Sequence, residues 1–392
     1  MRIAVVVNCH VGLEAGDSRG FDHPSYLDDF EASATLPATA RSLSEASVPE
    51  GDSLTCYVFG LAIDGSTGRD GEIREALERA MAPTGLRYEI LTNLDVERMA
   101  RAAPAEQRRF FSVAGYPEIR NLGFIVPVRR GDDVIVQIDD DEIVPRGYFA
   151  ATRALLEAHP DKALFTAPYE KNGTIRIRTA DDLRSWPKFS SMDRDMERLE
   201  RSSGPVQTLF GFGGNMIARA SFARKVFYPL GVPRGEDFSM LLAARLAFAA
   251  GGGTDAGLVA WFVNDRDLTV DHRPPAEAKK DFLAYLERNL RRFMLEWLMI
   301  HSQSAFDPAE LGSLSYYQEA MLGVGDYRQE TRRIYAELRE QASRGERGPI
   351  GVAAVDASEA RALAFFDASR SEPPRFPEYE RLRKLWIAML AS

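Results

Sequence analysis

The sequence feature that most constrains this chain is an apolar strand that runs directly into consecutive acidic residues, within Val134–Glu142. Side chains alternate between the faces of a strand, so we expect Asp139 and Asp141 on one side and Asp140 on the other. Neighbouring carboxylates repel one another, and oxygen ligands of this kind suit Mg²⁺ or Mn²⁺. Ligands of open α/β sheets bind beyond the carboxyl ends of the strands, where this cluster would lie. The alternative is an acidic loop in which one Asp caps the helix expected near Gly147–His159.

The first 160 residues alternate strand and helix patterns. Short apolar runs predict buried strands, and apolar residues three or four positions apart predict helices. Strands are expected at Ile3–Cys9, Leu54–Ile63, Leu86–Leu91, Asp132–Ile138, Ala163–Pro168 and Leu258–Val263. Helices are expected at residues 30–47, Glu72–Met81 and Asp237–Ala250, and Pro37 must either interrupt the first of them or lie near its start. This alternation predicts an α/β fold, an α/β/α sandwich on a mostly parallel central sheet.

The end of the chain has a different character, since it is helical after Pro274-Pro275. We therefore expect two units, residues 1–272 and a helical C-terminal extension of residues 273–392. An apolar stripe predicts a buried helix face at Phe282, Leu286, Leu290, Phe293, Trp297 and Ile300. We expect the stripe to form a cap on the first unit and a contact in a homodimer, with charged flanks at Arg288, Arg291 and Arg292. The basic flanks also allow contact with a membrane surface.

Charge and cysteine content exclude several classes of function. The chain has 392 residues, with 49 Lys and Arg against 58 Asp and Glu, which gives a formal net charge of −9. Duplex binding needs concentrated positive charge, so a nucleic-acid partner is not expected. Cys9 and Cys56 form no disulfide framework and suit a reducing compartment. No apolar stretch is long enough to span a membrane, and Met1–Val5 starts a strand rather than a signal peptide. We expect a soluble, cytoplasmic protein.

Two further motifs suggest chemistry. Glu236-Asp237 opens a strongly apolar helix, where acids can simply stabilise the N-terminus or can serve as a general base. Exposed backbone N–H groups at a helix start would favour the ionised form of Asp237. His272 follows a strand-like stretch and precedes a proline stop. An imidazole there is either structural or the third ligand of an Asp139, Asp141 and His272 metal site.

Two lesser segments could contact a ligand. Gly213-Gly214-Asn215 is a glycine turn where backbone could approach a ligand closely, although it can also be only a turn. Arg120-Asn121 precedes the acidic strand. Arg120 could offer a fork to a phosphate or a nucleobase, and the alternative is a surface salt bridge.

Taken in order, these segments resemble the GT-A-type nucleotide-sugar glycosyltransferases, and most of all the family 2 glycosyltransferases. The resemblance covers residues 1–272 and rests on an acidic turn at Asp64-Gly65-Ser66-Thr67, then Arg120-Asn121, Asp139-Asp140-Asp141, Gly213-Gly214-Asn215 and Glu236-Asp237. It implies a GT-A fold, a Mn²⁺ or Mg²⁺ ion held by Asp139, Asp141 and His272, and catalytic Asp237 with Glu236. It also implies that the sugar nucleotide contacts Asn8, Asp64, Arg120, Asn121, Asp140, Gly213 and Gly214.

The activity implied is metal-dependent transfer of a sugar from a nucleoside-diphosphate sugar to an acceptor hydroxyl. Asp237 would take the proton of the attacking hydroxyl in a single inverting displacement. A sugar-phosphate nucleotidyltransferase is one alternative, but its basic glycine-rich loop is poorly matched by Asn8–Gly12. A non-catalytic protein that binds sugar nucleotides or acts as a scaffold is the other.

Overall fold

The computed structural model describes residues 1–14, 21, 24–275 and 281–391. Its central sheet has the strand order β4-β3-β1-β5-β10-β7-β11-β9, with β2 paired to the end of β1. These strands are β1 (Arg2–Gly12), β2 (Ser25–Tyr26), β3 (Ser53–Ala62), β4 (Tyr88–Leu91), β5 (Val134–Asp139), β7 (Leu164–Thr166), β9 (Val206–Gln207), β10 (Asn215–Arg219) and β11 (Ala260–Phe262). The block β4-β3-β1-β5 is parallel throughout, whereas β10 is antiparallel to both of its neighbours. The predicted α/β fold with a mostly parallel central sheet is confirmed.

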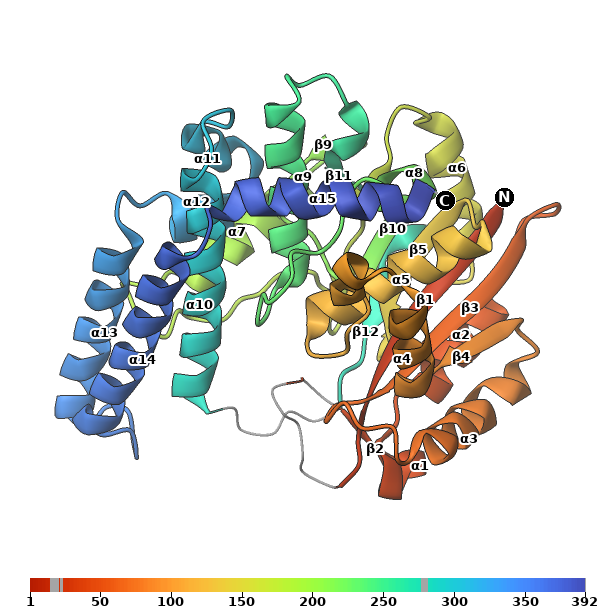
Figure 1. Cartoon of the computed structure of the whole chain (residues 1–392), viewed down its shortest axis with the longest axis horizontal. Coiled ribbons are helices and arrows are strands. Elements are labelled where there is room, and N and C mark those ends of the chain that lie inside the picture. The colour runs from red at the N-terminus through yellow and green to blue at the C-terminus, as the bar shows by residue number, and fades with distance from the viewer. Residues whose placement is uncertain (15–20, 22–23, 276–280, 392) are drawn as a thin grey trace.

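Helices cover both faces of this sheet, and the alternation of β1 explains why (Figure 1). Ile3, Val5 and Val7 are buried in one hydrophobic cluster, and Ala4 and Val6 in another. The sequence of a strand that is buried on both faces is an almost continuous apolar run, and the sequence of β1 has this character. The first cluster contains α2 (Leu36–Glu45), α3 (Asp70–Met81) and α6 (Tyr148–Ala158); the second contains α4 (Asn93–Ala102), α5 (Tyr116–Arg130), α7 (Lys188–Glu200), α8 (Ala220–Ala223) and α9 (Glu236–Ala250).

Short elements connect these layers. The helix expected over residues 30–47 is split into α1 (Phe30–Ser33) and α2, with Pro37 in the first turn of α2, where a proline is tolerated. A second sheet of three short strands consists of β6 (Glu142–Ile143), β12 (Val270–His272) and β8 (Tyr169–Glu170), in that order. Because β6 follows β5 after a two-residue turn, this sheet brings His272 close to the acidic end of β5. The 3₁₀ turns are η1 (Leu27–Asp29), η2 (Ala82–Thr84), η3 (Ala105–Phe110), η4 (Ala256–Leu258), η5 (Arg266–Leu268) and η6 (Pro308–Glu310).

The last third of the chain is helical, as predicted. It consists of α10 (Phe282–His301), α11 (Leu311–Leu314), α12 (Tyr316–Leu322), α13 (Tyr327–Ser343), α14 (Val352–Ser371) and α15 (Arg375–Ala391). Figure 1 shows α10, α13 and α14 side by side at one end of the molecule, and α15 crossing back over the helices of the sandwich. Trp386 of α15 is buried against Phe110 and Phe227, and its indole N–H donates to the Ala223 carbonyl at 2.7 Å. The boundary expected at residue 272 stays a prediction, since one hydrophobic cluster joins both parts.

The apolar stripe of α10 is buried within the chain. Leu286, Leu290, Phe293 and Ile300 are buried, and Phe282 and Trp297 are partly buried. Of the expected charged flanks, Arg292 is buried, where it donates to the Tyr317 hydroxyl and lies over the Phe293 ring. The burial within one chain supports the cap, whereas the dimer contact stays a prediction.

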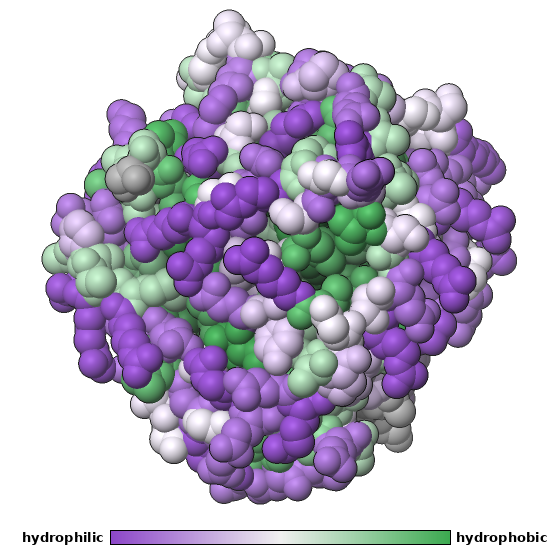
Figure 2. Space-filling model, turned by 90° about the vertical axis from the view of Figure 1, so that its right-hand side faces the viewer, coloured by the Kyte–Doolittle hydropathy of each residue, from purple (hydrophilic) through white to green (hydrophobic). Residues whose placement is uncertain are grey.

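None of the helices in the described part of the chain is long and apolar enough to cross a membrane. Figure 2 shows the face turned toward the right-hand side of Figure 1. Hydrophilic residues cover most of that face, and hydrophobic residues are confined to separate small areas.

Candidate active site

A cavity of about 890 Å³ opens at the carboxyl ends of β1 and β5, which is where ligands bind in open α/β sheets. Ten of the twelve residues singled out in the sequence line it. They are Asn8, Arg120, Asp139, Asp140, Asp141, Gly213, Gly214, Glu236, Asp237 and His272. The sequence pattern thus converges on one site although its members lie up to 264 positions apart (272 − 8).

Asn8 and Asp139 lie side by side in the parallel pair of β1 and β5. Strand alternation directs Asn8 away from the cluster that holds Val7 and Cys9. The Asn8 side chain is buried, and within the described residues neither its amide oxygen nor its amide nitrogen has a hydrogen-bond partner. A buried amide of this kind costs free energy unless a ligand or water bonds it. Asn8 is therefore placed and equipped to contact a ligand.

The three predicted metal ligands do not form one cluster. The Asp141 Oδ2 lies 3.2 Å from the His272 Nε2, whereas Asp139 Oδ1 accepts from the Arg120 guanidinium at 2.6 Å. The described residues include no group of three His, Cys, Asp or Glu side chains that could hold a metal ion. The three-residue site stays a prediction: Asp141 and His272 are in contact here, whereas Asp139 is paired with Arg120. Asp141 and His272 remain as a pair.

Asp140 faces a different environment from Asp139, as the strand alternation predicts. It interacts with the Cys9 thiol and with Thr35, and burial followed by the charge of Asp141 raises the pKa of Asp140 to about 8. Burial, and then the charge of Asp140, raises the pKa of Cys9 well above its usual value. Asp140 still reaches the cavity wall.

Arg120 links the two acidic segments. It is buried on α5, donates to Asp139 at 2.6 Å and lies 3.4 Å from Glu236 Oε1 at the start of α9. Two carboxylates that are 97 positions apart (236 − 139) are thus held by one planar guanidinium. The surface-salt-bridge alternative for Arg120 is wrong, because the Arg120 side chain is buried.

Asp237 is the carboxyl group of this site whose pKa lies closest to neutrality. Burial, and then the charge of Glu236, raises the pKa of Asp237 to about 7, although Arg292 acts in the opposite direction. The Phe238 backbone N–H favours ionised Asp237, as expected at a helix start, but the loss of water on burial outweighs this effect on the pKa. A carboxyl group that titrates near neutrality is suited to accept a proton during a reaction.

The two glycines of the predicted turn are required by close packing. A Cβ built on Gly214 would lie 2.0 Å from Glu142 Oε1, and one on Gly213 would lie 3.2 Å from the Asp237 carboxyl. Glu142 is fully buried and accepts from the Asp139 backbone N–H at 2.9 Å. The glycine turn therefore lets the backbone pack directly against the acidic side chains of the site.

Two of the predicted contacts lie outside the cavity lining. The Asn121 amide donates to the Tyr228 carbonyl at 2.9 Å and accepts from the Tyr228 N–H at 2.8 Å, so it ties α5 to the segment before α9. Asp64 Oδ1 accepts from the Ser66 backbone N–H at 2.9 Å in the turn after β3. The geometry of both residues is that of structural hydrogen bonds.

Other residues of the cavity were not found in the sequence. They include Tyr116, Lys188, Arg234, Tyr285, Asn289 and Tyr317, which come from the starts of α5, α7 and α12, the segment before α9, and α10. Isolated Lys, Arg and Tyr residues carry no motif, and only their meeting in space identifies them. Arg292, directly before Phe293 of the apolar stripe of α10, gave the one available signal, because it places a charge beside a buried stripe.

Comparison with known proteins gives the following findings. No protein-family model matches the chain, and no curated protein matches its sequence. Among solved structures it is similar to a mannosyltransferase from Pyrobaculum calidifontis in complex with GDP-Man and Mn²⁺, at 14% identity over 99% of this chain and 85% of that one, with a TM-score of 0.44. It is also similar to mannosyl-3-phosphoglycerate synthase from Rubrobacter xylanophilus, at 13% identity over 74% and 72% of the two chains, with a TM-score of 0.36. A third is mouse xyloside xylosyltransferase 1, at 12% identity over 56% and 67%, with a TM-score of 0.28.

Proposed function

We propose that this protein is a glycosyltransferase that moves a sugar from a nucleoside-diphosphate sugar to an acceptor hydroxyl, with Mn²⁺ or Mg²⁺ as cofactor. The observation that carries the proposal is the meeting of Asn8, Asp139–Asp141, His272 and Asp237 in one cavity at the carboxyl ends of β1 and β5. These are the positions where the GT-A resemblance expects donor, metal and base residues.

Asp141 and His272 would hold the metal ion. One carboxylate and one imidazole, 3.2 Å apart, fit an ion that takes its remaining ligands from water and from phosphate oxygens, which is the usual mode for Mg²⁺. When bound, the ion would neutralise negative charge on the departing diphosphate. Asp139 would act differently, because Arg120 already occupies its Oδ1.

The chain's own residues would divide the remaining work. The Asn8 amide would orient the donor, since it is buried at the cavity wall and has both polar atoms available. Arg120 would fix Asp139 and Glu236, so that neither carboxylate moves when the donor binds. Asp237, two residues after the left-handed Gly235 (φ +66°), would face the acceptor.

In the transfer step, the acceptor oxygen forms a bond to the anomeric carbon of the donor. The bond from that carbon to the diphosphate oxygen breaks, and the nucleoside diphosphate departs with the electron pair. The acceptor's proton passes to the Asp237 carboxylate, whose pKa near 7 suits this exchange. A single displacement of this kind inverts the configuration at the anomeric carbon.

A thermal-shift screen tests the binding part of the proposal. Nucleoside diphosphates and nucleoside-diphosphate sugars are added with Mn²⁺ or with a chelator, and the melting temperature is recorded. A ligand that binds only the native state raises the melting temperature by mass action. We expect one nucleobase to give the largest rise, and the rise to depend on Mn²⁺. No rise with any member of a panel covering the common nucleobases would refute the proposal.

A further inference from the structure

Cationic side chains form a second chemical region of the active-site cavity. The acidic residues of the cavity come from the end of β5 and the start of α9, whereas the cations of this second region come from other segments. The cations of this second region are Lys171, Arg176, Arg178, Lys188, Arg234 and Arg292. The same cavity is also lined by the carboxylates of β5 and α9, so the positive charge of these side chains is confined to this second region.

Two of these cations gather on one aromatic ring. The Lys188 Nζ lies 5.4 Å from the centroid of the Tyr285 ring, and the Arg234 Cζ lies 5.5 Å from the same centroid. Lys188 starts α7, Arg234 precedes α9 and Tyr285 belongs to α10, so three separate segments build this feature. Lys188 is only 7% exposed, although lysine is rarely buried. An ammonium and a guanidinium that both lie within 5.5 Å of one ring centroid can each bind phosphate or carboxylate oxygens.

A hydrogen-bond acceptor lies beside the cations. The Asn289 side chain is 1% exposed and lines the cavity. Its amide N–H donates to the Tyr285 carbonyl at 2.8 Å, whereas its Oδ1 has no hydrogen-bond partner among the described residues. An acceptor atom of this kind suits a hydroxyl donor on the ligand. One turn further along α10, Arg292 stabilises the negative charge of Asp237, which connects this region to the proposed base.

We propose that the acceptor of the reaction is a hydroxyl compound that carries a phosphate or carboxylate group, and that Lys188 and Arg234 bind this anion. The proposal rests on the glycosyltransferase function above. The anionic end would lie at Lys188 and Arg234, a hydroxyl would donate to Asn289, and the attacking hydroxyl would face Asp237. A cavity of about 890 Å³ is at the upper end of the range for small-molecule sites and leaves room beside the donor.

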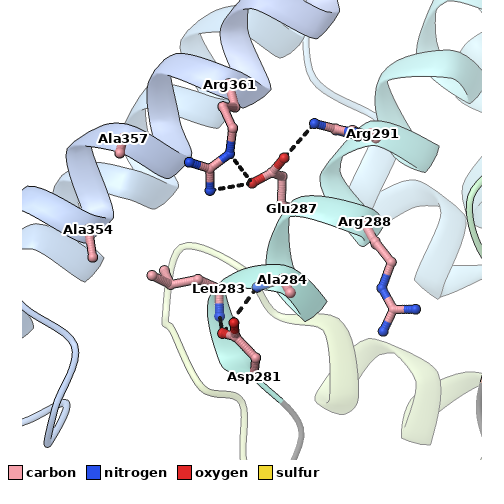
Figure 3. Close-up of a pocket in the computed structure, with 9 residues that line it drawn as sticks. All are labelled: Asp281, Leu283, Ala284, Glu287, Arg288, Arg291, Ala354, Ala357 and Arg361. Carbon is pink, nitrogen blue, oxygen red and sulfur yellow. Dashed lines mark hydrogen bonds and ion pairs between the residues drawn. The ribbon is translucent and has the colours of Figure 1, made fainter. Parts of the chain in front are cut away.

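A second cavity of about 310 Å³, between α10 and α14, supplies a control. Figure 3 shows Arg291 and Arg361 both directed at Glu287, with distances of 2.5 Å and 2.9 Å to its carboxylate oxygens. Each of these arginines thus has a carboxylate partner in the same cavity. Arg361→Gln therefore removes an arginine from a cavity wall without touching Lys188 or Arg234.

The test measures binding of inorganic phosphate to the full chain by calorimetry in the presence of a chelator. We expect binding by the wild type, and a loss of at least about tenfold in affinity in Lys188→Met and in Arg234→Gln, since each removes a charge-assisted contact worth roughly that much. Arg361→Gln should bind as the wild type does. Melting temperatures without phosphate identify a variant that fails to fold, and the half-buried Arg234 provides the second variant if Lys188→Met does. Unchanged phosphate binding in both variants, or a loss confined to Arg361→Gln, would overturn the proposal.

A second experiment tests whether the anion that binds at Lys188 and Arg234 belongs to the acceptor or to the diphosphate of the donor. The enzyme is first saturated with the nucleoside diphosphate and Mn²⁺, and phosphate is then added. We expect phosphate still to bind, with an affinity that depends on Lys188 and Arg234. Complete exclusion of phosphate would place the diphosphate of the donor on these cations and would overturn the acceptor assignment. Failure of every sugar nucleotide to bind, with phosphate binding intact, would instead refute the glycosyltransferase function alone.

Discussion

The carboxylate of Asp141 lies 3.2 Å from the imidazole Nε2 of His272, across the antiparallel pairing of β6 and β12. The two residues are 131 positions apart (272 − 141), and the small three-stranded sheet brings them together. The pair lies on the wall of the candidate active-site cavity, where Asp139 is paired with Arg120. This relationship decides which residues are expected to hold a metal ion.

The first prediction concerns that pair. Asp141→Asn and His272→Ala should each lower Mn²⁺-dependent affinity for the nucleoside diphosphate by at least about 10–100-fold, which is the range found even for residues that only support metal ligands. Calorimetric titration with and without a chelator measures the change. Asp271→Asn is the control, because Asp271 precedes His272 on β12 and pairs with the exposed Arg273. Equal Mn²⁺ dependence in all three variants would remove the metal from this position.

The second prediction concerns Asp237. Its pKa of about 7 means that the basic, ionised form gains population as the pH rises through neutrality. The kcat/KM of the transfer should therefore rise with pH up to about 7 and then level off. Asp237→Asn should lower turnover by roughly 10²–10⁴-fold while donor binding persists.

Glu236→Gln is the informative comparison for Asp237. The charge of Glu236 contributes to the raised pKa of Asp237, so its removal should move the rising part of the pH profile to lower pH. The loss in turnover should be smaller than in Asp237→Asn. If Glu236→Gln is the more damaging change, Glu236 is the base. Wild-type turnover in both variants would exclude either residue as the base.

The third prediction concerns the glycine turn. A methyl group on Gly214 would meet the buried Glu142 carboxylate at 2.0 Å, so Gly214→Ala should destabilise the fold by roughly 1–3 kcal/mol, as overpacking does. Chemical denaturation measures the free energy of unfolding. Gly68→Ala is the matched control, since a Cβ there meets nothing within 4 Å and should change the stability by less than about 0.5 kcal/mol. An equal effect of the two substitutions would contradict the packing described for Gly214.

The fourth prediction concerns the C-terminal helices. Trp386→Ala should lower the free energy of unfolding by about 3–5 kcal/mol, because the indole is fully buried against Phe110 and Phe227. Ile387→Ala, on the exposed side of the same helix, is the control and should cost far less. We also expect one cooperative unfolding transition for the whole chain. Two transitions, with Trp386→Ala affecting only one of them, would instead support separable units.

The fold could be predicted to a large extent from local patterns. The β1 and β5 runs are apolar on both faces and carry the signature of central parallel strands, and Glu236-Asp237 with the apolar residues after it predicts α9. Ten of the predicted site residues meet because their segments end at the same edge of the sheet. This convergence follows from topology, which a strand pattern largely fixes.

The remainder of the site depends on side-chain environment, which no local pattern specifies. The Asp139 pairing with Arg120 and the raised pKa of Asp237 both follow from burial and from charges contributed by distant segments. Lys188 and Arg234 have no motif around them, and Tyr285 on α10 unites them only in the folded chain. Tertiary contacts between the helical region and the sandwich therefore determine these side-chain environments, which the sequence alone does not show.

Product analysis tests the central claim most directly. The enzyme is incubated with Mn²⁺ and the nucleoside-diphosphate sugar that stabilises it most, with and without hydroxyl compounds that carry phosphate or carboxylate, and the nucleotide products are separated. The account predicts release of the nucleoside diphosphate together with a glycosylated acceptor, and loss of both products in Asp237→Asn. Formation of a nucleoside triphosphate and a sugar phosphate in a parallel incubation of the donor with added pyrophosphate would contradict it, as would no turnover of a tightly bound donor with any acceptor of that class.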